Sequence, residues 1–218
     1  MATREEVLGR IRASLADVGT ADEVVIPRGY HRTRDQPEGT LERFRERVAD
    51  YKAIIERVPA GGVAEAVDAA LRQYGANRVA VPPALPEEWL AAGHRSDSLV
   101  VDSPEAPLSV AELDAIDAVV TGSVVGIAET GTIVLESGGL CGRRALTLVP
   151  DVHVCIVRAR DVVDDVPAAI ERLAPSRPLT WISGPSATSD IELDRVEGVH
   201  GPRTLHVLLV PEDDRGPS

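Results

Sequence analysis

The chain has 218 residues, enough for one ordinary domain with an extension, and its hydrophobic (44%) and charged (27%) contents are those of a globular protein. It carries 23 basic residues against 35 acidic ones, which gives a net charge of −12. Nucleic-acid binding requires a positive field and stacking side chains, so this charge and an aromatic content of only 3% argue against it.

The two cysteines, Cys141 and Cys155, are too few for a four-cysteine iron–sulfur or zinc site. No Walker loop and no GxGxxG, HExxH or GxSxG motif is present. We therefore expect no metal site and no bound cofactor. The N-terminal region has no continuous apolar block, and no segment reaches the roughly 18 apolar residues of a membrane span. These features predict a cytoplasmic protein.

Helices are predicted for the N-terminal part of the chain. A capping-box pattern at Thr3 and Glu6 predicts the start of an amphipathic helix. Residues 19–39 read as a connection, and its basic segment 28–34 is either a solvated loop or an arm that reaches an anionic ligand or a neighbouring subunit. A second helix is predicted over residues 40–58, because apolar residues recur there at steps of three and four.

Helices alternate with short apolar strands after residue 61, which indicates an α/β fold with an open, mostly parallel sheet covered by helices. The interval at 129–131 is too short for a helix, so its flanking strands are predicted to form a hairpin. We expect an N-terminal helical extension (1–60), an α/β domain (61–211) and a polar tail (212–218). The predicted elements are helix 63–74, strands 78–81, 98–101, 118–121, 124–128, 132–135, 152–157, 179–183 and 204–210, a short helix at 87–92, and helices after Ser109, near 166–173 and after Ser189.

The first candidate site is the hairpin segment with Glu129, Thr130, Gly131 and Thr132. A carboxylate at a tight turn between two buried strands is unusual, and the glycine allows a ligand to approach the backbone closely. Glu129 is a candidate catalytic base or nucleophile whose pKa partial burial would raise. The alternative is a turn whose glutamate points into solvent and whose Gly131 supplies a positive φ.

The second candidate site is the arginine pair Arg143 and Arg144, which follows Gly142. The guanidinium fork binds carboxylates and phosphates through two hydrogen bonds, so both residues are candidate anion ligands. The alternative is a pair of surface arginines that balance nearby acidic residues. His153, close by at the start of a predicted strand, is interpreted as structural rather than catalytic.

The third candidate site is the loop at 183–190, between a predicted strand and a predicted helix. Ligands bind outside the carboxyl ends of parallel strands, and the start of a helix attracts anions. The alternative is that Ser189 merely caps the predicted helix, an interpretation that does not explain Ser186 and Thr188. His200, in the sharp loop before the last strand, is a second catalytic candidate. The candidate anion-binding residues of this region are Gly184, Ser186, Thr188, Asp190 and Gly201.

Five short motifs together resemble a known family. They are Ala128–Leu135 (AETGTIVL), Gly142–Leu146 (GRRAL), Pro150–His153 (PDVH), Gly184–Ser186 with Asp190–Glu192 (GPS and DIE), and Gly198–Pro202 (GVHGP). In this order and spacing they resemble the LUD-domain family, and within it the lactate utilization protein C (LutC/YkgG) group. The resemblance covers residues 60–211.

The resemblance implies a fold similar to the ribose-5-phosphate isomerase, glucosamine-6-phosphate deaminase and CoA-transferase group. It also implies a role in oxidising L-lactate to pyruvate together with iron–sulfur partner proteins of the A and B types. This chain lacks the cluster cysteines of the B-type partner, so electron transfer is not located in it.

Three interpretations of function follow, and whether the chain is itself an enzyme is left open. In the first it is a non-redox component of a lactate-utilisation system that binds a small carboxylate or phosphate or stabilises the assembly. In the second it is a self-contained transferase, hydrolase or isomerase-like enzyme that acts on a phosphorylated or CoA-linked molecule. In the third it is a purely structural partner. All three are compatible with a homo-oligomer.

Overall fold

The computed structural model describes residues 3–16, 27, 29, 37–59, 61–90, 98–174, 176–188, 196–197 and 201–211. The chain forms two compact units, residues 1–31 and 32–218. In the first unit, α1 (Arg4–Ser14) begins at the predicted capping box, in which the Glu6 N–H donates to Thr3 and the Thr3 N–H donates to the Glu6 carboxylate. The side chains of α1 are not buried.

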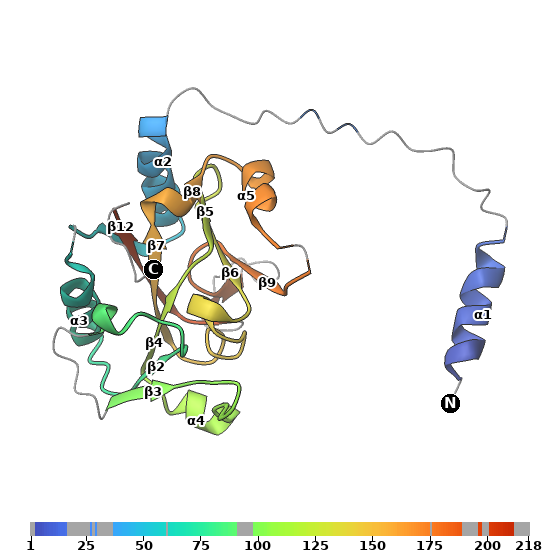
Figure 1. The fold of residues 1–218 in the computed structure, drawn as a ribbon, viewed down its shortest axis with the longest axis horizontal. Helices are drawn as coiled ribbons and strands as arrows, with labels where there is room; N and C mark the ends of the chain where they lie inside the picture. The colour runs from blue at the N-terminus through green and yellow to red at the C-terminus, as the bar shows by residue number, and fades with distance from the viewer. Residues whose placement is uncertain are drawn as a thin grey trace. The chain divides into compact units, whose positions relative to one another are not determined.

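The second unit is built on a six-stranded, fully parallel sheet with the strand order β1-β12-β7-β4-β2-β3 (Figure 1). All of these strands except β1 were predicted, so the α/β fold with an open, mostly parallel sheet is confirmed. The strands are β1 (Ile54–Arg57), β2 (Val79–Val81), β3 (Leu99–Val101), β4 (Ala118–Gly122), β7 (Val152–Arg158) and β12 (Thr204–Val210).

Strand β1 corrects the prediction of a helix over residues 40–58. Helix α2 (Pro37–Asp50) ends eight residues earlier, and Lys52, with a φ of 65°, turns the chain into β1. The apolar pattern continued across this boundary because Ile55 of β1 packs into the same core as Phe44 and Val48 of α2. The sheet therefore includes residues on the N-terminal side of the expected boundary at residue 61.

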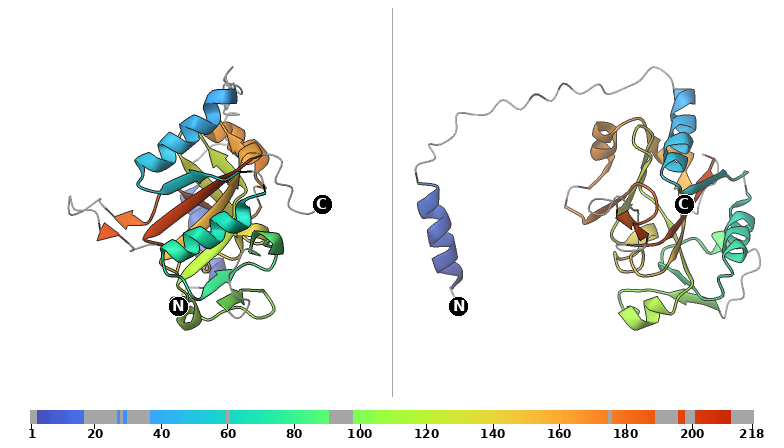
Figure 2. Two further views of the ribbon diagram at one scale, coloured as in Figure 1. Left: turned by 90° about the vertical axis from the view of Figure 1, so that its left-hand side faces the viewer. Right: turned by 180° about the vertical axis from the view of Figure 1, so that it is seen from behind.

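Helix α3 (Val63–Gln73) covers one face of the six-stranded sheet (Figure 2). It packs on alternate residues of the central strands, including Val154, Ile156 and Leu208. The opposite face near β2 and β4 is covered by α4 (Val110–Asp114), which begins at a capping box on Ser109 as predicted. Within the described ranges, short 3₁₀ helices are formed by Glu87–Trp89, Gly139–Cys141 and Ala159–Asp161.

A second, four-stranded sheet with the order β8-β5-β6-β9 lies beside the first. It contains the predicted hairpin of β5 (Val125–Ile127) and β6 (Thr132–Glu136), together with β8 (Val162–Val163) and β9 (Leu179–Ile182). Strand β9 runs antiparallel to β6, which corrects the expectation that residues 179–183 belong to the parallel sheet.

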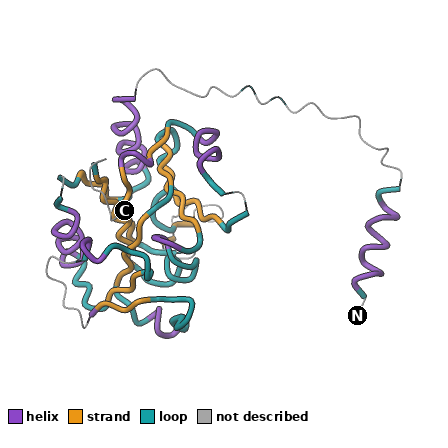
Figure 3. The backbone as a smooth tube through the Cα atoms, viewed as in Figure 1, coloured by secondary structure: helices purple, strands orange, loops and turns teal. Residues whose placement is uncertain are grey.

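The helices of the second unit pack on the two sheets (Figure 3). Helix α5 (Val166–Arg172) covers the four-stranded sheet, and α2 lies with its inner face in the core between the two sheets. A separate antiparallel ribbon of β10 (Ala187–Thr188) and β11 (Val196–Glu197) follows β9. Among the described residues, no helix has the length and apolar character that a membrane crossing needs.

Candidate functional site

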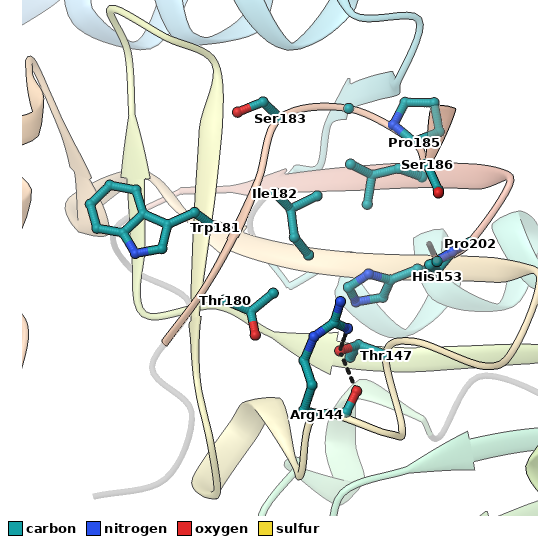
Figure 4. Close-up of a pocket in the computed structure, with 13 residues that line it drawn as sticks. Arg144, Thr147, His153, Thr180, Trp181, Ile182, Ser183, Pro185, Ser186 and Pro202 are labelled. Carbon is teal, nitrogen blue, oxygen red and sulfur yellow. Dashed lines mark hydrogen bonds between the residues drawn. The ribbon is translucent and has the colours of Figure 1, made fainter. Parts of the chain in front are cut away.

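A cavity of about 250 Å³ lies beside the amino-terminal ends of β7 and β12 and against β9 (Figure 4). This is the opposite end of the parallel strands from the one that the sequence argument favoured. The cavity forms there because β9, a strand of the second sheet, lies next to these strand ends. It supplies Thr180, Trp181 and Ile182 to the cavity wall. Its lining residues are Arg144, Thr147, His153, Thr180, Trp181, Ile182, Ser183, Gly184, Pro185, Ser186, Gly201, Pro202 and Leu205.

Arg144 is the charged residue among the described residues that line the cavity. Among the described residues, its guanidinium has one hydrogen-bond partner, Thr147 Oγ1, at 3.4 Å from Nη1. Burial lowers the pKa of Arg144 from its usual value, but an arginine remains protonated because its usual pKa lies above 12. The cavity therefore holds a partly buried positive charge with most of its N–H donors available to a ligand.

His153, the second residue of β7, faces the same cavity next to Arg144 (Figure 4). Its side chain is buried, and its Nε2 lies 2.8 Å from the hydroxyl of Thr121 on β4. Burial and the nearby positive charge of Arg144 lower the pKa of His153 to about 4. At neutral pH the imidazole is therefore uncharged and offers hydrogen bonding without a second positive charge.

Arg143 turns away from this cavity. Its Nε and Nη2 atoms donate to both carboxylate oxygens of the buried Asp102, and Nη2 also donates to the carbonyl oxygen of Leu108. Of the adjacent arginines proposed as anion ligands, the structure brings only Arg144 to the cavity. Gly142, which precedes the two arginines, has a φ of 68°, and a Cβ there would lie 2.6 Å from Leu146 Cδ2.

The hairpin residues lie behind the cavity wall and not in it. Glu129 is exposed in the turn, where its N–H donates to the carbonyl oxygen of Asp164. Thr130 donates to Thr132, whose hydroxyl lies 2.8 Å from that of the cavity residue Ser183. Gly131 has the predicted positive φ, 62°, and packs against the backbone of Arg47.

The loop after β9 forms one side of the cavity. Three residues of the third candidate site line the cavity, as predicted: Gly184, Ser186 and Gly201. The Ser186 N–H donates to the carbonyl oxygen of Pro202. Thr188 lies in β10, so residues 187–188, which were predicted as part of a loop, form a short strand. Asp190, His200 and the helix predicted after Ser189 lie outside the described residues.

A second cavity of about 230 Å³ shares the side chains of Arg144, Thr147 and Thr180 with the first. Cys141 lines it, and burial raises the pKa of this thiol to about 11. Cys155 lies nearby, and both sulfurs approach the carbonyl oxygen of Gly122, at 3.6 and 3.8 Å. The described residues contain no group of three or more potential metal ligands.

Several cavity residues were not identified from the sequence: Thr147, Thr180, Trp181, Ile182, Pro185, Pro202 and Leu205. Three of them, Thr180, Trp181 and Ile182, lie on strand β9, whose pairing with β6 no local pattern specifies. Thr147 offered a usable signal, because it follows Arg144 by three residues in a short turn where two such side chains lie close together.

These features define an α/β protein in which one partly buried arginine faces a cavity between two sheets. The chain belongs to the LUD domain family, whose sequence profile matches residues 39–210. A lactate utilization protein C from Deinococcus radiodurans is 49% identical over 78% of this chain and 79% of that protein.

Other relatives agree with this membership. A lactate utilization protein C from Bacillus subtilis is 28% identical over 80% of this chain and 70% of that protein. The crystal structure of a DUF162 family protein from Deinococcus radiodurans matches with a TM-score of 0.68 and 42% identity, covering 80% of this chain and 98% of that one. Because both the sequence and the fold match over most of the chain, family membership rests on two separate comparisons.

Proposed function

We propose that this chain is a non-redox component of a lactate-utilisation system and binds a small carboxylate in the Arg144 cavity. The observation that carries the binding site is the partly buried guanidinium of Arg144, which has only Thr147 as a hydrogen-bond partner among the described residues. The names of the relatives support the metabolic role.

The charge of the cavity favours a singly charged acid. Of the described lining residues only Arg144 is charged, because His153 is neutral at physiological pH. One guanidinium fork matches one carboxylate group. A phosphate ester carries nearly two charges at neutral pH and would leave one of them without a partner. L-lactate and pyruvate are acids of the favoured kind.

Isothermal titration calorimetry with L-lactate, pyruvate and inorganic phosphate tests the binding site. We expect the two carboxylates to bind more tightly than phosphate, and Arg144→Gln to weaken their binding about tenfold or more. The control is Arg203→Gln, since Arg203 is exposed and pairs with the exposed Asp151. Absence of carboxylate binding to the unaltered protein would refute the proposed site.

The role in the system requires a separate experiment. We expect the chain to co-purify with iron–sulfur proteins of the A and B types, and to be required for lactate-dependent reduction of an electron acceptor by the mixture. Equal reduction rates with and without the chain would contradict this role, whatever the binding measurements show.

A further inference from the structure

We infer that Thr132 is a positioning residue that holds the cavity loop at Ser183–Ser186 and so sets the affinity of the Arg144 cavity for carboxylates. This inference rests on the proposed function only for the nature of the ligand. It assigns a role to the AETGT hairpin, whose residues do not line the cavity but whose hydroxyl groups reach its wall.

A chain of three hydroxyl groups connects the hairpin to the loop. Thr130 Oγ1 donates to Thr132 Oγ1 at 2.7 Å, and Thr132 Oγ1 lies 2.8 Å from Ser183 Oγ. Since Thr132 accepts the proton of Thr130, its own proton is available for Ser183. Thr132 is only 5% exposed, so water does not readily replace either partner.

The side chain of Ser183 points away from Arg144, toward the hairpin (Figure 4). Its hydroxyl therefore serves the hairpin contact and not the cavity. Ser183 instead affects the cavity through the backbone that follows it. This backbone places Gly184, Pro185 and Ser186 at the cavity wall.

Two further contacts hold the same loop. Gly184 has a φ of 85°, and a Cβ there would lie 2.6 Å from Tyr51 Cβ, so the loop lies directly against the end of α2. The Ser186 N–H donates to the Pro202 carbonyl oxygen at 2.9 Å. Among the described contacts, the bond from Thr132 is the one that fixes the first residue of the loop, where the chain leaves β9.

A loop that is already fixed loses less conformational freedom when a ligand binds. Removal of the Thr132 hydroxyl would free the start of the loop and would leave the hydroxyl of Ser183 without this partner. A neutral hydrogen bond of this kind changes an equilibrium constant by about threefold to tenfold. We therefore expect a loss of carboxylate affinity of that size.

The experiment compares Thr132→Val, Thr132→Ser, Ser183→Ala and the double variant Thr132→Val with Ser183→Ala. Hydrogen–deuterium exchange of the peptide that spans 182–187 is measured without ligand, and L-lactate affinity is measured by calorimetry. Ser123→Ala is the control, because it removes a different buried hydroxyl bond, to the carbonyl oxygen of Ile156 at the other end of the parallel strands.

We expect faster exchange and a threefold to tenfold weaker affinity in Thr132→Val and Ser183→Ala, and values near those of the unaltered protein in Thr132→Ser and Ser123→Ala. The double variant should be no worse than the more severe single variant. Unchanged exchange in Thr132→Val, or additive effects in the double variant, would overturn the inference. If L-lactate does not bind the unaltered protein, the proposed function fails and the exchange data alone decide the role of Thr132.

Discussion

Arg143 holds Asp102 through three hydrogen bonds, from Nε to Oδ2 at 2.8 Å and to Oδ1 at 3.1 Å, and from Nη2 to Oδ1 at 2.9 Å. Asp102 has no exposed side-chain surface, and it also accepts the N–H of Leu108. The pair thus ties the loop after β3 to the turn that carries Arg144. The two adjacent arginines therefore have different roles, since Arg143 stabilises the fold and Arg144 is available to a ligand.

Asp102→Asn should lower the free energy of unfolding by about 3 kcal/mol, because it removes one charge of a partly buried ion pair. Urea denaturation followed by circular dichroism measures the change. Asp151→Asn is the control, since Asp151 and Arg203 are both about 60% exposed and such pairs contribute roughly 0–1 kcal/mol. Similar small losses in both variants would contradict the structural role of Asp102.

Gly131→Ala should destabilise the protein more than Gly75→Ala. The two glycines have nearly the same φ, 62° and 63°, so the conformational cost of alanine is shared, at about 1–2 kcal/mol. A Cβ at Gly131 would lie 2.6 Å from the Arg47 carbonyl carbon, whereas a Cβ at Gly75 would meet nothing within 4 Å. Thermal unfolding of both variants gives the comparison, and an equal loss would show that the hairpin turn does not pack on α2.

Stability should fall as the pH is lowered from 7 to 5 because of His153. The pKa of this residue is about 4 in the folded protein, against a usual value of 6.5, so the unfolded chain binds the extra proton first. The contribution of His153 should decrease by about 2 kcal/mol over this interval. In His153→Gln, urea denaturation at the two pH values should show a pH dependence smaller by that amount. An equal dependence would mean that the folded protein accommodates the charged imidazole.

The two thiols should be unreactive in the native protein. Burial raises the pKa of Cys141 to about 11 and raises that of Cys155 further above its usual value. The thiolate is the reactive form, and it is scarce at pH 8. Iodoacetamide should therefore label neither cysteine until urea is added, as intact mass spectrometry would show. Rapid labelling of Cys141 without urea would show that the second cavity opens.

Much of the sheet follows from local patterns in the sequence. Three strands are short and rich in apolar and β-branched residues: Val79–Val81, Ala118–Gly122 and Thr204–Val210. Gly75 closes helix α3 before the first of them, as expected. Residues 54–57 were read as helix because their apolar side chains continue the spacing of α2. Only the pairing of β1 with β12, far along the chain, makes them a strand.

The candidate site was less predictable. The sequence singled out Arg144 and the loop at Gly184, and the structure brings them to one cavity. It could not separate Arg144 from Arg143, because the distinction depends on Asp102, which lies 41 positions away. It also could not place Thr132 beside Ser183, since that contact arises when β9 joins β6.

The position of β12 between β1 and β7 also has a consequence for synthesis on the ribosome. Glu56 of β1 and His206 of β12 form a hydrogen bond across 150 positions, and β12 follows every other strand of its sheet in the chain. While the nascent chain lacks β12, no strand pairs with the facing edges of β1 and β7. The six-stranded sheet is then incomplete. A message truncated before codon 204 would therefore yield a product with two open strand edges, which is suited to aggregation or degradation and not to partial activity.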